Sequence, residues 1–201
     1  MSEPQNISSA AVIAAMRHWV ERAVIGLNLC PFAKAVHLKG QIRYVVSEAR
    51  TQDALLAELK TELQFLHATP AEQTDNTLLI HPQVLTEFTE FKTFLPRADA
   101  ALRRAGLIGE IQIANFHPQY QFADSEPDDP ANYTNRAPYP TLHLLREASL
   151  DRAVQAFPDA ALIYERNIAT LTALGHAGWE KLQIKPAAPG AGTERKASPP
   201  V

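Results

Sequence analysis

Three of the seven histidines stand where neighbouring strands could bring them together. His81 and His117 each follow a short apolar run typical of a strand, and each is followed by proline. His143 lies inside the apolar run Leu142–Leu145. Imidazole acts as a general acid or base near neutral pH, so His117 and His143 are predicted catalytic groups. All three together would suit a divalent metal ion with an open position, which makes His81, His117 and His143 candidate metal ligands.

Each histidine also has an ordinary structural interpretation. His81 and His117 can be strand-end residues that bond a nearby carbonyl, and His143 can be a satisfied core residue. The sequence contains no His-x-His or His-x-x-x-His pair to strengthen the metal hypothesis. The two interpretations stay open at the level of sequence.

The only cysteine, Cys30, is a further candidate catalytic residue. One cysteine cannot form an intrachain disulfide, but a thiolate beside a basic partner can act as a nucleophile. The ordinary alternative is a small buried hydrophobic side chain.

A long aperiodic segment, residues 118–139, separates the last two predicted strands. Structureless loops of this length in compact domains are commonly functional, and its aromatic residues favour packing over disorder. We therefore expect a lid-like loop over a ligand, with a purely structural loop as the alternative. Arginine binds carboxylate or phosphate through paired hydrogen bonds. The candidate substrate-binding residues are Arg136, Tyr120, Asn132 and Arg146.

Hydrophobic spacing predicts the elements that must position these groups. Strands are expected at residues 42–46, 77–80, 110–116 and 141–145, and helices at 9–25, 51–66, 86–105, 149–156 and 159–174. Gly26 is expected to end the first helix at positive φ, and Pro96 to kink or split the third.

Alternation of strands and helices predicts a single α/β domain with a small, mainly parallel four-stranded sheet flanked by helices. The first three strands should run parallel, and the fourth is expected to return antiparallel beside the third. This arrangement would bring His117, His143 and Arg136 into one pocket under the loop. The domain is expected to span residues 9–184, with a frayed segment 1–8 and a disordered tail 185–201.

The overall composition excludes several classes of partner. The 201 residues carry a net charge of −3, which gives no general attraction for nucleic acid or anionic lipid. No apolar run is long enough to cross a bilayer and the first residues lack a basic segment, so a cytoplasmic protein with a small-molecule ligand is expected. Neither a Walker motif nor G-x-G-x-x-G occurs.

Three longer runs together resemble a bacterial family of domains of unknown function, numbered fourteen-fifteen. They are residues 26–33, 114–122 and 132–147, and the resemblance extends over about residues 8–175. It implies no activity and assigns no residue a role.

The residues themselves predict an enzyme that acts on a small polar or anionic substrate, such as a histidine-dependent or metal-dependent hydrolase. The alternative is a non-catalytic module that binds a small molecule or peptide in the same pocket.

Overall fold

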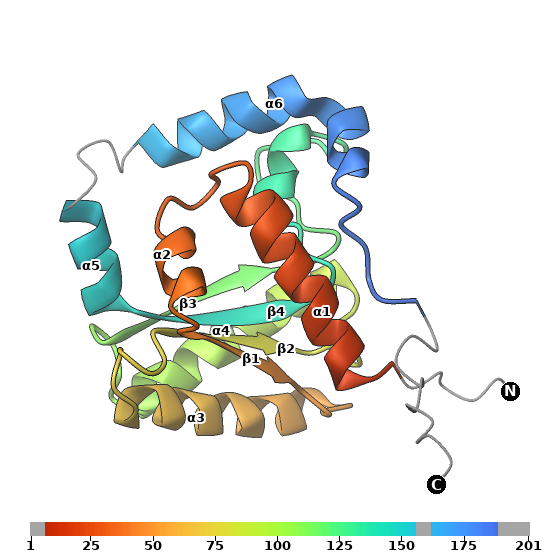
Figure 1. Cartoon of the computed structure of the whole chain (residues 1–201). Coiled ribbons are helices and arrows are strands. Elements are labelled where there is room, and N and C mark those ends of the chain that lie inside the picture. Colours follow the sequence, from red (N-terminus) through yellow and green to blue (C-terminus); the bar gives the residue numbers. More distant parts are fainter. Residues whose placement is uncertain (1–6, 156–161, 189–201) are drawn as a thin grey trace, which may run out of the picture.

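A computed structural model describes residues 7–155 and 162–188, which form one sheet covered by helices on both faces (Figure 1). The expected frayed segment lies mostly outside the described residues, as do residues 189–201 of the expected tail. The elements are α1 Ser9–Trp19, a π-helix η1 Val20–Ile25, α2 Ala33–Leu38, β1 Ile42–Val46, α3 Gln52–Ala68, β2 Asn76–Ile80, α4 Phe88–Arg104, β3 Ile111–Phe116, a 3₁₀ helix η2 Pro130–Thr134, β4 Thr141–Arg146, α5 Glu147–Gln155 and α6 Ile163–Lys181.

The sheet is mixed, with the strand order β1-β2-β4-β3. Strands β1 and β2 pair in parallel, whereas β4 lies between β2 and β3 and pairs antiparallel with both. The expected antiparallel return of β4 beside β3 is confirmed, but the expected mainly parallel sheet is wrong. The long segment after β3 lets the chain insert its last strand in the middle, so β4 takes the ladder hydrogen bonds that β2 and β3 would otherwise share.

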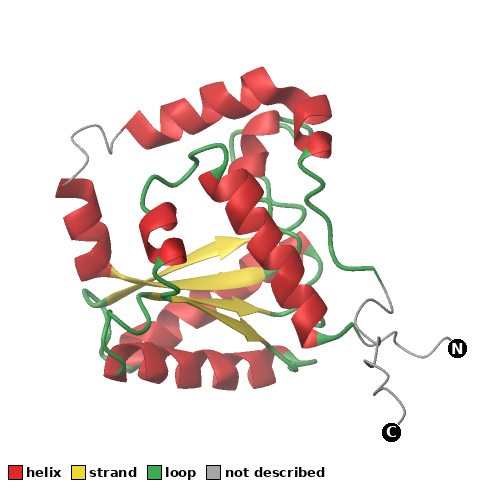
Figure 2. Cartoon of the chain, in the orientation of Figure 1, coloured by secondary structure: helices red, strands yellow, loops and turns green. Residues whose placement is uncertain are grey.

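Helices α3 and α4 cover one face of the sheet, and α1 and α2 lie on the other (Figures 1 and 2). Successive residues of a strand point to opposite faces, and β4 follows this rule. Leu142 and Leu144 belong to the core against α3 and α4. Leu78 and Ile80 of β2 belong to the core beneath α1.

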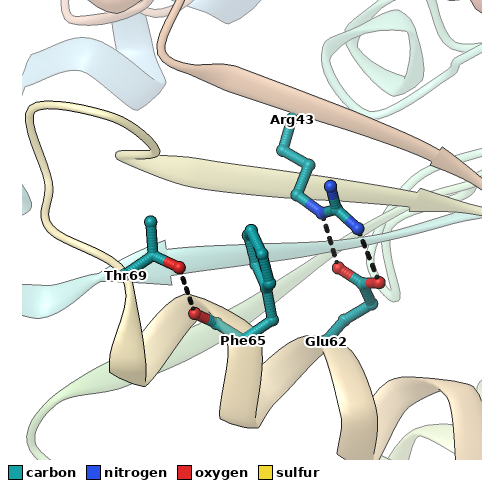
Figure 3. A network of polar contacts seen from close by, with 4 residues as sticks. All are labelled: Arg43, Glu62, Phe65 and Thr69. Atoms are coloured by element: carbon teal, nitrogen blue, oxygen red, sulfur yellow. Dashed lines mark hydrogen bonds and ion pairs between the residues drawn. The ribbon is translucent and has the colours of Figure 1, made fainter.

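The α3 side of the core follows the predicted leucine spacing. Leu55, Leu59, Leu63 and Leu66 of α3 are fully buried, and Thr51 caps the helix by accepting a hydrogen bond from the Ala54 amide. An ion pair ties the same helix to the edge strand β1 (Figure 3). Arg43 donates from Nε to Glu62 at 2.9 Å and lies over the Phe65 ring at 4.1 Å.

Two predictions about helix ends and breaks are corrected. Gly26 caps the π-helix η1 with a right-handed φ of −61°, and the left-handed position falls two residues later, on Asn28. Helix α4 is not divided at Pro96, since Phe91, Phe94 and Ala98 hold both halves on the sheet. No helix in the described part of the chain is both long and apolar enough to span a membrane.

Candidate functional site

The α1–α2 side of the sheet contains a cavity of about 760 Å³, a volume within the usual range for small-molecule sites. Its floor is formed by β2, β3 and β4, through Leu78, Ala114 and His143. These three residues are register partners across the sheet, so their side chains lie in one row. The other walls come from the end of α1, η1, the segment 29–39 that includes α2, and the start of α5.

His143 is the histidine that the structure places in this cavity. Its Nε2 lies 3.1 Å from Oδ1 of Asn76, which begins the neighbouring strand β2. Nε2–H donates to that amide oxygen, so Nδ1 carries the free lone pair. Burial lowers the pKa of His143 to about 4, and the ring is therefore neutral at pH 7.

Cys30 lines the same cavity from the segment that covers the sheet. Its sulfur accepts hydrogen bonds from the backbone N–H groups of Phe32 and Ala33, which favour the thiolate, but burial is the larger effect and raises the pKa of the thiol. Cys30 is therefore a neutral thiol at pH 7. The structure brings Cys30 and His143 to one cavity, but within the described chain no hydrogen bond joins them.

Arg146 reaches the cavity from the end of β4. Its Nε and Nη2 donate to the backbone carbonyls of Leu66, Thr69 and Thr74, which fix the guanidinium against the end of α3. All these acceptors are neutral. Among residues 7–155 and 162–188, no carboxylate pairs with Arg146, and Nη1 has no hydrogen-bond partner. Arg146 thus carries a positive charge, without a carboxylate partner among the described residues, where the end of β4 meets the end of α3 beside the cavity.

The other two candidate histidines lie on the opposite face of the sheet, against α4. The Phe116 side chain lines the cavity, so the next residue, His117, points the other way. The Phe91 ring of α4 lies 5.3 Å from the His117 ring and 5.6 Å from the His81 ring. His81 and His117 therefore converge, as predicted, but the expected pocket that joins His117 to His143 does not form, because the sheet separates them.

Most of the ring nitrogens of these two histidines are hydrogen-bonded to backbone groups. His117 bonds the Leu85 carbonyl through Nε2 and accepts from the Gln119 amide at Nδ1. His81 bonds the Val84 carbonyl through Nδ1, and its buried Nε2 has no partner among the described residues. The expected metal set of His81, His117 and His143 is not brought together, and the described segments contain no other group of three or more His, Cys, Asp or Glu side chains suited to a metal ion.

The 118–139 loop is held together by its own side chains. Arg136 donates from Nε to the Tyr120 carbonyl and from Nη2 to the Pro127 carbonyl, so both bonds stay within the loop. Asn132 is fully buried and bonds Phe122, Ser125 and Glu126. These bonds correct the expected position of the site: of this loop, only Thr134 and Asn135 reach the cavity.

Helix α6 covers the same loop from outside. Tyr133 of η2 stacks on Trp179 with the ring centres 4.3 Å apart, and its hydroxyl lies 2.8 Å from Nδ1 of His176. Tyr120, another candidate ligand-binding residue, packs against Phe88 and Phe122. Arg136, Asn132 and Tyr120 therefore order the loop and do not line the cavity.

Two parts of the site were missed in the sequence. Helix α2 has only six residues, too few for a periodic pattern to predict it. Trp19 also lines the cavity and is 2% exposed, yet its Nε1–H has no acceptor among the described residues. The apolar spacing of α1 marked Trp19 as core, and nothing in that spacing distinguished it from the other buried residues of α1.

Comparison with known proteins identifies the family and goes no further. No curated protein and no solved structure matches the chain. A family model matches residues 11–181, which include every residue of the cavity named above, and confirms the resemblance drawn from the sequence. The chain belongs to the family described as protein of unknown function, DUF1415.

Proposed function

We propose that the protein is an enzyme that acts on a small anionic molecule in the cavity, with His143 as its proton-transfer group. One observation carries the proposal: a neutral histidine, fixed at one nitrogen by Asn76, lines the same cavity as Arg146, whose guanidinium has no carboxylate partner among the described residues. Such a pairing of an anion-binding group with an available base is typical of active sites.

Hydrolysis is the reaction class that these groups suit best. The hydrogen bond from Nε2–H to Asn76 leaves Nδ1 to accept a proton from water as the water oxygen attacks an ester or phosphoryl centre. The imidazolium then returns the proton to the leaving oxygen. Arg146 would hold the anionic group, and Cys30 is a second candidate nucleophile that needs a base to lose its proton. The separation of the three histidines removes the support for a metal-dependent version.

A non-catalytic binding module is the second candidate, and two observations favour it. Burial lowers the pKa of His143 to about 4, which makes the ring a weak base. Most of the cavity lining is also apolar, as a site built to hold a ligand without transforming it would be.

Hydrolysis of a panel of anionic carboxylate esters and phosphate monoesters tests the proposal. His143→Gln should lower kcat by about a hundredfold or more, the usual contribution of a general base. His67→Gln is the matched control, because His67 is an exposed histidine of α3 on the other side of the sheet. An active protein in which His143→Gln matches wild type would contradict the catalytic role. Ligand binding without turnover of any panel member would favour the binding module.

A further inference from the structure

The cavity has a charged end and an apolar end. Strand register orients it, because Asp75 and Arg146 flank the paired residues Asn76 and Leu145 at one end of the sheet. Phe116, paired with Thr141, lies at the other end. From Thr141 to Arg146 the strand rises roughly 17 Å at about 3.4 Å per residue, so the floor is much longer than a small polar ion.

The charged end carries an excess of positive charge. Lys39, Arg146 and Arg152 line it together with the carboxylates of Glu72 and Asp75, which leaves a net charge of +1. Ser149 engages two of these groups: its hydroxyl donates to Asp75 at 2.7 Å and accepts from Arg152 at 3.0 Å. Arg146 is bonded only to neutral carbonyls. One negative charge on a ligand would complete the balance at this end.

The other end is apolar. Trp19 and Phe116 meet there edge to face with ring centres 4.9 Å apart, and Val20, Val24 and Leu29 also line the cavity. An ion without an apolar body would leave these side chains uncovered, whereas burial of such a body stabilises a complex by about 25 cal/mol per Å² of apolar surface.

We propose that the cavity binds an amphipathic anion, with its carboxylate or phosphate head at the charged end beside Lys39, Arg146 and Arg152 and its apolar body along the sheet toward Phe116. This inference names the ligand class of the proposed active site and rests on that assignment of the cavity, although not on catalysis.

Calorimetric titration of the whole chain tests the inference with octanoate, octyl phosphate, 1-octanol and acetate, each below its micelle concentration. Octanoate or octyl phosphate should bind at least about tenfold more tightly than both 1-octanol and acetate, and the tighter of the two identifies the head group. Equal binding of octanoate and 1-octanol, or no binding of either anionic amphiphile, would overturn the inference.

Variants locate the binding site. Arg146→Met should weaken octanoate binding by about tenfold or more, since the charged end of the cavity loses a positive charge, whereas Arg104→Gln, an exposed arginine of α4, should not change it. Arg146 also bonds the end of α3, so its substitution could disturb the fold. A second variant leaves that contact intact: Ala114→Leu puts a larger side chain on the cavity floor and should abolish binding of octanoate. Unchanged binding in a folded Ala114→Leu protein would place the ligand elsewhere.

The result separates this inference from the proposed function. Amphiphile binding without turnover would uphold the ligand class and contradict the enzyme. Turnover that depends on His143, with no amphiphile binding, would uphold the enzyme and overturn the ligand class.

Discussion

Two buried histidines on opposite faces of the sheet share a lowered pKa but differ in their surroundings. His143 and His81 are both neutral and both have a pKa near 4, because burial disfavours the imidazolium. Yet His143 borders a cavity, whereas His81 is fully enclosed beside Phe91. The position of the cavity, and not the perturbed pKa, therefore distinguishes the functional candidate.

The buried histidines make the stability of the fold depend on pH. An unfolded histidine titrates near pH 6.5, so between pH 6.5 and 4 the unfolded chain binds more protons than the folded one. The free energy of unfolding should be highest above pH 6.5, fall as the pH drops, and level off below pH 4 with respect to these groups. The shift of His81 corresponds to about 3 kcal/mol, a large part of the stability of a typical domain.

Urea unfolding between pH 5 and pH 7.5 measures this effect. His81→Gln should lower stability at pH 7.5 but flatten the pH dependence, because the substituted residue does not titrate. A wild-type slope in His81→Gln would show that the buried imidazole is not responsible.

At the scale of elements, the 118–139 loop depends on a few internal anchors. Asn132 accepts hydrogen bonds from the Phe122 amide and the Ser125 hydroxyl and donates one to the Glu126 carbonyl. A single hydrogen bond adds little to the free energy of unfolding, but a buried polar group left without its partner lowers it by the full cost of desolvating that group.

Asn132→Ala should therefore lower the free energy of unfolding by about 3 kcal/mol, since buried polar groups in the loop lose their partner. Asp124→Ala, an exposed position in the same loop, should change it by less than about 0.5 kcal/mol. Thermal unfolding of the two variants checks both values. A stable Asn132→Ala protein that has lost ligand binding would instead restore the lid hypothesis for this loop.

At the scale of the molecule, the C-terminal segment returns to the core after α6. Leu182 and Ile184 pack against the cluster beneath α1, and the Ala187 amide donates to the Tyr139 hydroxyl at 2.7 Å. The Leu182 carbonyl lies 2.8 Å from Nε2 of His18 in α1. This segment therefore connects α6 with the first helix.

Comparison of two truncated chains isolates that contribution. A chain that ends at residue 181 should melt about 4 °C or more below one that ends at residue 188, because it loses the partial burial of two aliphatic side chains, about 2 kcal/mol in all. Equal Tm values would show that residues 182–188 add nothing to the stability of the fold.

The sequence was sufficient to predict the strands. Strand Ile42–Val46 was predicted with its bounds as observed, and the other three strands within one residue, because runs of alternating or continuous apolar residues are recorded directly in the sequence. The N-caps that the structure shows at Ser8 and Thr51 are likewise local, because each joins a side chain to an amide three residues further along the chain. These features depend on neighbours along the chain, so no tertiary information was needed.

Only the tertiary structure decided which of the candidate residues meet. The insertion of β4 between β2 and β3 depends on how three distant segments pair, and no local pattern encodes that choice. The same insertion puts Leu78, His143 and Ala114 in one row on the cavity floor. Side-chain alternation then sends His117 to the opposite face. The sequence by itself determined the strands, most of the helices and the residues with reactive side chains. Strand order, and the face of the sheet to which each side chain points, are long-range properties, and they decided that Cys30, His143 and Arg146 line the cavity.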